Sequence, residues 1–126
     1  FRSIDFFKRI NDTFGHDSGD VVLKSTALRV RELLRSSDCA ARFGGEEFII
    51  LLKETPVDAA MAMAEAVRAR IAGVPFDAVG HVSASFGVAT WDHKEDSHGL
   101  IKRADTALYK AKSSGRNCVV QAEGAA

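Results

Sequence analysis

The stretch of sequence that decides the fold is Phe43-Gly44-Gly45-Glu46-Glu47-Phe48. Its two adjacent glycines predict a tight turn, because glycine adopts positive φ angles without steric cost. They also allow a ligand to approach the backbone without striking a Cβ atom. The segments on either side, 39–43 and 47–52, are short and apolar, so we expect a β-hairpin that turns at Gly44 and Gly45.

Two carboxylates follow the glycines, at the point where the chain enters the second strand of the hairpin. Glu46 and Glu47 would be costly at the mouth of a buried strand unless a cation met them. Mg²⁺ bound together with nucleotide phosphates would satisfy them, since this ion combines one or two carboxylates with phosphate oxygens. A plain turn with solvated acids is the simpler interpretation of the glycine pair taken alone.

The segments around the hairpin alternate between helix-like and strand-like patterns. The expected helices are a brief one over 6–13 closed by Gly15, one over 19–35 capped by Asp17, one opened by Thr55 and Pro56, and one opened by Asp96 or Ser97 and closed by Gly115. Further strands are expected at 1–5, 82–91 and 117–121. This order predicts an α/β (α+β) sandwich, in which helices flank a mixed, mainly antiparallel central sheet.

The composition is that of one soluble domain. The chain has 126 residues, 17 of them basic and 17 acidic. A net charge of zero argues against binding long nucleic acids, whereas a mononucleotide site needs only a few local charges. No apolar run approaches the length of a membrane span. Cys39 and Cys118 lie in apolar runs, so we expect buried free thiols in a reducing, cytoplasmic environment.

Several further motifs, in order along the whole chain, resemble the GGDEF family of diguanylate cyclases, and in particular its response-regulator cyclases. They are Ile4-Asp5-Phe6-Phe7-Lys8-Arg9-Ile10-Asn11-Asp12, Gly15-His16-Asp17, Gly19-Asp20, Arg42 through Phe48, Ser85-Phe86-Gly87-Val88-Ala89, Lys102-Arg103-Ala104-Asp105, and Tyr109-Lys110-Ala111-Lys112 through Gly115-Arg116-Asn117. The resemblance implies one GGDEF domain over 1–126 with a nucleotidyl-cyclase-like fold. It also implies that two GTP molecules are condensed into cyclic di-GMP and two pyrophosphates in a catalytic homodimer.

The resemblance implies a role for each catalytic residue. Glu46 would bind the metal and accept the proton, and Glu47 would serve a second metal or the attacking hydroxyl. The Ile4 carbonyl would be another metal ligand, and Lys8 would stabilise charge on the phosphates. The cofactor would be Mg²⁺ or Mn²⁺.

The resemblance also implies a guanine nucleotide pocket. Asn11 and Asp20 match the residues that bind guanine, whose N1–H and amino group a carboxylate can accept, and His16 would belong to the same pocket. The other implied GTP contacts are Phe6 and Phe7 (both mostly core), Gly44, Gly45, Lys112 and Arg116. Taken alone, Asn11 is also typical of a turn, Asp20 of a first helical turn, and the two basic residues of a helix C-terminus.

Arg35 and Asp38 resemble the family's product-inhibition site, which binds cyclic di-GMP. A guanidinium can donate to guanine O6 and N7 while a carboxylate accepts from the opposite edge. The simpler interpretation is an exposed ion pair at a helix end. Ala66 replaces a further arginine of that site, so Arg68 or Arg70 would have to substitute.

Ser3 stands where the family has a metal-binding aspartate. Asp5 projects to the same face of the strand and could partly replace the lost charge. Natural loss of activity, engineered inactivation and a junction at the cut end of the chain would each explain the serine; we favour the last. The family's upstream helix and the start of the first strand are absent, so we expect an N-terminal truncation, with a sensory or receiver domain upstream.

A catalytically impaired module that binds cyclic di-GMP or GTP is therefore the alternative to an active cyclase. A purely structural dimerisation domain is a weaker third interpretation, because so many polar site residues remain.

Overall fold

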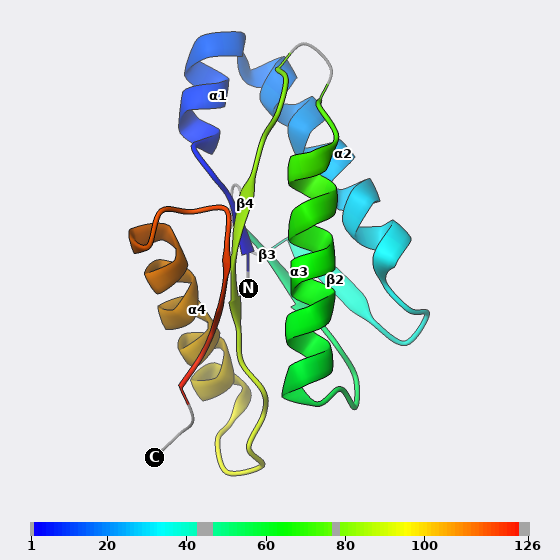
Figure 1. Ribbon diagram of the computed structural model, residues 1–126, viewed down its shortest axis with the longest axis vertical. Coiled ribbons are helices and arrows are strands. Elements are labelled where there is room, and N and C mark those ends of the chain that lie inside the picture. Colours follow the sequence, from blue (N-terminus) through cyan, green and yellow to red (C-terminus); the bar gives the residue numbers. More distant parts are fainter. Residues whose placement is uncertain (1, 43–46, 77–78, 124–126) are drawn as a thin grey trace.

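The computed structural model describes residues 2–42, 47–76 and 79–123 (Figure 1). The strands are β1 (Arg2–Ile4), β2 (Cys39–Arg42), β3 (Glu47–Leu51), β4 (Ala84–Val88) and β5 (Val119–Gln121). The helices are α1 (Phe7–Phe14), α2 (His16–Leu33), α3 (Val57–Gly73) and α4 (Ser97–Ser113).

The five strands form one sheet in the order β2-β3-β1-β4-β5. The central strand β1 runs antiparallel to both β3 and β4, and β2 runs antiparallel to β3. Only the β4–β5 pair is parallel among the described strands. The expected mixed, mainly antiparallel sheet is confirmed, and so are the two strands on either side of the double glycine.

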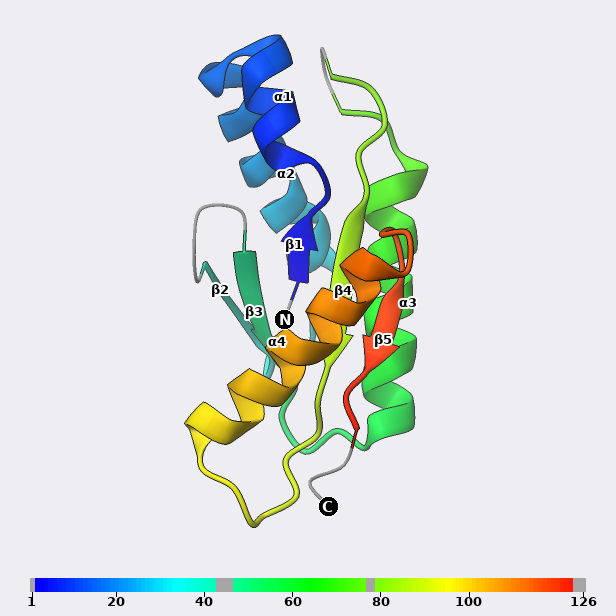
Figure 2. The ribbon, with the colours of Figure 1, turned by 90° about the vertical axis from the view of Figure 1, so that its left-hand side faces the viewer.

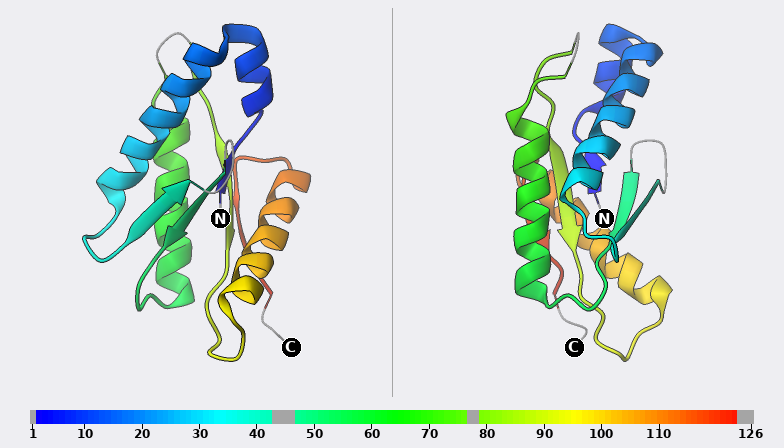
Figure 3. Two further views of the ribbon diagram at one scale, coloured as in Figure 1. Left: turned by 180° about the vertical axis from the view of Figure 1, so that it is seen from behind. Right: turned by 90° about the vertical axis from the view of Figure 1, so that its right-hand side faces the viewer.

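Helices cover both faces of the sheet. Figure 2 shows α4 crossing in front of β4 while α3 lies behind it. The helix α2 packs against α3 and α1, and Figure 1 shows α1 beyond one end of the sheet. Figure 3 shows how α2 leads through a short loop into β2, at the edge of the sheet.

The main core lies between the sheet and the α2–α3 layer. It consists of Ile4, Ile10, Val22, Leu23, Val30, Phe48, Ala64, Val67, Ile71, Phe76, Val82, Ala84 and Phe86. On β4, Ala84 and Phe86 point into this core, and Gly87 faces α4 instead. A Cβ atom on Gly87 would lie 2.1 Å from the Ala104 carbonyl oxygen, so α4 packs directly on the strand backbone.

Two of the expected helix caps are confirmed. The Asp96 carboxylate accepts a hydrogen bond from the Gly99 N–H at 2.9 Å, at the start of α4. Gly115 follows the end of the same helix with φ +112°, and the Arg116 N–H bonds to the Ala111 carbonyl at 3.0 Å. Both caps depend only on residues within a few positions of the helix end.

Two other expected caps are wrong. The helix α2 begins at His16, because Gly15 (φ 91°) turns the chain directly out of α1, and Asp17 lies inside the first turn. Thr55 does not cap α3, which begins at Val57. Its hydroxyl donates to the Lys53 carbonyl at 3.0 Å and accepts from the Arg35 guanidinium at 2.6 Å.

Both cysteines are free thiols, but the expected burial is wrong for Cys39. It lies on the exposed edge strand β2, all of whose residues are accessible to solvent. Cys118 is half-buried, with its Sγ 3.4 Å from the Ala111 carbonyl oxygen. Across the residues placed by the structure, no helix is long and apolar enough to cross a bilayer.

Candidate nucleotide and metal site

The sheet brings Ser3 and Glu47 together. Ser3 lies opposite Glu47 on β3 and opposite Ser85 on β4. The Asp5 N–H bonds to the Ser83 carbonyl at 2.9 Å, so alternate residues of this strand direct their backbone groups toward β4. Ser3 and Glu47 are therefore a non-hydrogen-bonded pair, in which side chains lie closest, and the intervening Ile4 carbonyl is directed toward β3.

The oxygen donors around Ser3 and Glu47 fit a magnesium ion only if phosphate oxygens complete its coordination. Over 2–42, 47–76 and 79–123, no three His, Cys, Asp or Glu side chains gather into a cluster that could hold a metal by itself. The Glu47 carboxylate, the Ile4 carbonyl and the Ser3 hydroxyl are one anionic and two neutral oxygen donors. Mg²⁺ commonly binds one or two carboxylates and completes its shell with phosphate oxygens and water. Glu46, Gly44 and Gly45 lie outside the described residues.

Asp5 does not take over the role of the missing carboxylate. Its side chain is 4% exposed. One oxygen accepts from the Ser85 hydroxyl at 2.6 Å, and the other accepts from the Ser83 hydroxyl at 2.6 Å and the Asn117 N–H at 3.0 Å. Both oxygens are thus engaged with β4 and the turn after α4, so the expectation that Asp5 compensates for Ser3 is not supported.

The start of α1 presents backbone N–H groups that no described residue caps. Phe6 precedes the helix in the left-handed conformation (φ 57°), and no side chain in the described part of the chain caps this end. The first helical bond runs from the Ile10 N–H to the Phe6 carbonyl at 3.1 Å. The N–H groups of residues 6–9 therefore have no helical acceptor, which is the arrangement that binds phosphates at helix N-termini.

Two arginine side chains lie at the same helix end. The Arg116 guanidinium lies 4.6 Å from the centroid of the Phe6 ring, and that of Arg9 lies 5.2 Å from it. Lys8 is exposed in the first turn of α1, and Lys112 is half-buried in the last turn of α4. Phe6 itself is 53% exposed, so its expected burial is wrong, whereas Phe7 packs against the core.

The two predicted guanine contacts lie where α1 crosses α2. A Cβ atom on Gly19 would lie 1.7 Å from Asn11 Oδ1, so the Asn11 side chain rests on the bare backbone of α2. Asp20 follows Gly19 and is exposed, and His16 is exposed in the first turn of the same helix. The functional reason for Gly19 was missed from the sequence, although the Gly19-Asp20 motif was a signal for it.

Arg35 and Asp38 form a bidentate ion pair. Arg35 Nε donates to Asp38 Oδ2 at 3.0 Å and Nη2 donates to Oδ1 at 2.8 Å. These hydrogen bonds hold the pKa of Asp38 below its usual range and raise that of Arg35. The Asp38 side chain is fully covered while that of Arg35 is 49% exposed. Arg35 Nη1 donates to no described residue.

Arg68 lies away from this pair. It is eleven residues after Val57, or about 16 Å along the helix from the end that contacts Thr55 and Arg35. Its guanidinium binds Glu65 and donates from Nη1 to Asn117 Oδ1 at 2.9 Å. Arg70 pairs with Glu32 on α2. The structure therefore does not bring Arg68 or Arg70 to Arg35 and Asp38.

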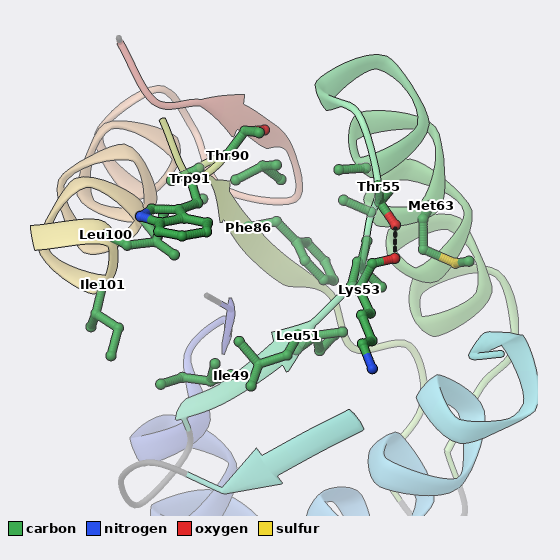
Figure 4. A pocket seen from close by; sticks show the side chains of 18 of the residues that line it. Ile49, Leu51, Lys53, Thr55, Met63, Phe86, Thr90, Trp91, Leu100 and Ile101 are labelled. Carbon is green, nitrogen blue, oxygen red and sulfur yellow. Dashed lines mark hydrogen bonds between the residues drawn. The ribbon is translucent and has the colours of Figure 1, made fainter. Parts of the chain in front are cut away.

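A large pocket lies elsewhere in the described part of the chain. It has a volume of about 710 Å³ and lies among β3, α3, β4 and α4, where β1 does not extend between its neighbours (Figure 4). Its walls are mostly apolar, and Leu51, Met63, Phe86 and Leu100 are among the residues that line it (Figure 4). None of the predicted site residues lines it, and it lacks the cluster of cations that a triphosphate needs.

Four polar residues around the site were not identified as functional from the sequence. They are Glu65, Ser83, Ser85 and Asn117. Ser85 and Asn117 lay within the quoted motifs, but their partners are up to 112 residues away in sequence. Only the tertiary structure shows what they bind.

The chain matches the family described as diguanylate cyclase, GGDEF domain, over residues 1–118. It is 47% identical over 124 residues to the response regulator PleD of Caulobacter vibrioides, covering 93% of this chain and 27% of PleD. It is 44% identical over 120 residues to diguanylate cyclase A of Treponema denticola, covering 92% of this chain and 32% of that protein. The chain thus spans about a quarter to a third of these relatives.

Solved structures show the same arrangement. The active GGEEF domain of a diguanylate cyclase from Vibrio cholerae superposes with a TM-score of 0.91 at 40% identity, covering 98% of this chain and 81% of that one. The GGDEF domain of DgcB from Caulobacter crescentus, in complex with c-di-GMP, superposes with a TM-score of 0.91 at 32% identity, covering 98% and 75%.

Proposed function

Because this chain belongs to the GGDEF family of diguanylate cyclase domains, we propose that it binds GTP and condenses two molecules of it into cyclic di-GMP. The triphosphate would lie between the start of α1 and the Ser3–Glu47 pair. The observation that supports this most directly is the start of α1, whose first N–H groups have no helical acceptor and no cap among the described residues, and which lies beside Arg116. Lys8 in the first turn of α1 and Lys112 in the last turn of α4 would add positive charge.

Guanine would be bound at the crossing of α1 and α2. Asn11 and Asp20 supply an amide and a carboxylate at neighbouring positions, and His16 lies one turn before Asp20. A carboxylate accepts from N1–H and the amino group of guanine, which adenine does not present in the same pattern. GTP is therefore the nucleotide that this pair of side chains favours.

The reaction needs two domains, each carrying one GTP. The 3′-oxygen of one nucleotide bonds to the α-phosphorus of the other, the bond to the β-phosphate oxygen breaks, and pyrophosphate leaves. The hydroxyl proton goes to a glutamate of the hairpin, Glu46 by family resemblance, with Glu47 beside it. Performed in both directions across a homodimer, this closes the cyclic dinucleotide.

A divalent ion, Mg²⁺ or Mn²⁺, would be held by Glu47, the Ile4 carbonyl and Glu46 together with the phosphates. When bound it would neutralise phosphate charge. Ser3 contributes a hydroxyl in place of a carboxylate, so this chain is expected to hold the ion less strongly than an aspartate at position 3 would.

A second candidate function is a module that binds cyclic di-GMP or GTP with impaired catalysis. Ser3 favours this function, because a serine in place of an aspartate leaves the proposed metal site with one negative charge fewer. Asp5 does not replace that charge, since its carboxylate binds Ser85 and the Asn117 N–H. The Arg35–Asp38 pair favours product binding, because Arg35 Nη1, which donates to no described residue, could donate to an edge of guanine. Arg68 lies outside that proposed site, because its guanidinium binds Glu65 and Asn117.

Incubation with Mg-GTP or Mn-GTP followed by chromatography separates the two functions. A cyclase produces cyclic di-GMP and pyrophosphate. Its rate should rise steeply with protein concentration, because two domains must associate. The absence of product at every concentration would leave only the binding module.

The Ser3→Asp variant tests whether the serine at position 3 limits activity. It should raise the turnover rate and lower the Mg²⁺ concentration needed for half-maximal GTP binding, because it restores a charge opposite Glu47. Ser97→Asp, which adds the same charge at an exposed position at the start of α4, is the matched control. Equal behaviour of the two variants would show that position 3 does not contact the metal.

We also propose that an upstream sensory or receiver domain of the intact protein pairs two such domains in the cytoplasm. The similarity to PleD, a response regulator, supports this arrangement. Cross-linking of the intact protein with and without its input signal would test it, and an unchanged dimer fraction would count against it.

A further inference from the structure

The turn between α4 and β5 is held from three sides. Arg68 on α3 donates from Nη1 to Asn117 Oδ1 at 2.9 Å, and Glu65 binds the same guanidinium. The Asn117 N–H is directed to Asp5 Oδ2 at 3.0 Å and to the Ser85 hydroxyl at 3.2 Å. A helix, the end of β1 and the middle of β4 thus meet at one residue of this turn.

The turn requires such anchors because its backbone is strained. Gly115, Arg116 and Asn117 have successive φ angles of 112°, 65° and 46°. Glycine adopts this region freely, but side-chain-bearing residues occupy it only where the surroundings hold them there. The hydrogen bonds to Asn117 are the contacts that hold this backbone from outside the turn.

Arg116 is the middle residue of the turn, and its position depends on the residues beside it. Its guanidinium lies over the ring of Phe6, 4.6 Å from the centroid, at the uncapped start of α1. Phe6 directly follows Asp5, the residue that binds the Asn117 N–H. Asp5 therefore fixes the backbone on both sides of the space where the phosphates are proposed to bind.

We propose that Arg68 is a positioning residue, which acts through Asn117 to present Arg116 to the phosphates of the nucleotide. Asp5 and Ser85 also hold Asn117, by accepting hydrogen bonds from its backbone N–H, and Glu65 orients Arg68. This inference rests on the proposed GTP site. Its physical basis is preorganisation: a side chain held in its bound position loses less conformational freedom when the ligand arrives.

The competing explanation is that Arg68 only stabilises the fold. The Arg68–Glu65 pair spans one helical turn near the surface, where such ion pairs contribute little. A role in the fold alone would affect all ligands equally. A positioning role affects only the part of the ligand that Arg116 touches.

Calorimetric titration with Mg-GTP and with GMP distinguishes these explanations, because GMP keeps the guanine but lacks the β- and γ-phosphates. Arg116→Ala should weaken GTP binding by roughly tenfold or more, the loss of one charge-assisted contact. Arg68→Ala should weaken it by about threefold to tenfold, and both variants should bind GMP as the unaltered chain does. The double variant should bind GTP no more weakly than Arg116→Ala alone, because Arg68 acts through Arg116.

Two further variants complete the series. Arg68→Lys should recover part of the GTP affinity, since an ammonium can still donate to Asn117 Oδ1. Arg70→Ala, which removes an arginine of the same helix that pairs with Glu32, is the matched control and should bind GTP normally. If Arg68→Ala proves unfolded by thermal melting, Glu65→Gln loosens the same guanidinium and should give a smaller loss confined to GTP.

The outcomes of these titrations distinguish a failure of the proposed GTP site from a failure of the positioning role. Unchanged GTP affinity in Arg116→Ala would overturn the phosphate site of the proposed function. A loss in Arg116→Ala without one in Arg68→Ala or Glu65→Gln would overturn the positioning role alone. Equal losses for GTP and GMP, or losses that multiply in the double variant, would also overturn it.

Discussion

Replacing Gly19 with alanine separates the stability of the domain from its recognition of guanine. The new Cβ atom would lie 1.7 Å from Asn11 Oδ1 and 2.9 Å from its Cγ, but 3.4 Å from Phe7 Cζ, an ordinary contact. The obstacle is thus the end of one flexible side chain. We expect Asn11 to rotate away while the two helices stay in place.

The magnitudes follow from two opposing effects on folding. Alanine within a helix is favoured over glycine by about 1 kcal/mol. Forcing Asn11 out of its rotamer costs about 0.5–1.5 kcal/mol. The free energy of unfolding should therefore change by no more than ~1 kcal/mol, which corresponds to a shift in Tm of less than about 8 °C.

Nucleotide binding should change much more than stability. Loss of the Asn11 contact removes a hydrogen bond to guanine, worth about 1–2 kcal/mol, or roughly 5- to 30-fold in affinity. The assay is titration calorimetry with Mg-GTP and Mg-ATP, together with thermal melting. The expected outcome is a lower ratio of GTP to ATP affinity in a normally folded protein.

Gly73→Ala is the matched control for this variant. Gly73 also lies in a helix, and a Cβ atom there would meet nothing within 4 Å. This control should gain stability and bind both nucleotides normally. If Gly19→Ala kept full selectivity for GTP, either Asn11 does not contact guanine or it does not need the bare backbone of Gly19, and the reasoning would be refuted.

Three further outcomes follow from the structure. Gly87→Ala should lower the free energy of unfolding by about 1–3 kcal/mol or more in chemical denaturation, because its Cβ atom would meet the Ala104 carbonyl at 2.1 Å and backbone cannot rotate away; an unchanged midpoint would contradict the packing of α4 on β4. Asp38 has a lowered folded-state pKa, so its pairing with Arg35 stabilises the protein above the ordinary pKa of about 3.9 and is lost as pH falls through the folded value. Asp38→Asn should therefore lose less stability than the unaltered chain between pH 7 and pH 3, and equal losses would show that the pair does not contribute. Arg35→Ala should weaken binding of cyclic di-GMP, measured by calorimetry, by roughly tenfold while GTP binding is kept; equal affinity for cyclic di-GMP would exclude Arg35 from the product site.

Local signals in the sequence predicted what depends on nearby residues. The Asp96 cap and the Gly115 stop both involve contacts within five residues of a helix end. The cap predicted at Asp17 was wrong because Gly15 lets α2 begin at His16, one residue before Asp17 and directly after α1. The cap predicted at Thr55 was wrong because a more distant group competes for its side chain. Arg35, twenty residues from Thr55 in sequence, occupies the hydroxyl that was expected to cap α3.

The residues of the candidate site also differ in how far they could be predicted from the sequence. The proposed guanine contacts Asn11 and Asp20 and the proposed metal ligand Glu47 could be predicted from the sequence, through the resemblance of its motifs to the family. The roles of Asp5 and Arg68 could not, because each depends on a partner in another layer of the fold. Arg68 and Asn117 are 49 residues apart in sequence, and Asp5 and Asn117 are 112 apart.

The amino-acid sequence alone determined the hairpin, the alternation of helices and strands, and the family. Each of these depends on the spacing of apolar residues, on turn residues or on short motifs. Only the tertiary structure decided that β1 lies at the centre of the sheet, that Ser3 faces Glu47, and that Arg68 supports Asn117 rather than Arg35. The physical reason is that strand order and register set which side chains meet. Those choices follow from burying the whole core at once, and no single segment contains them.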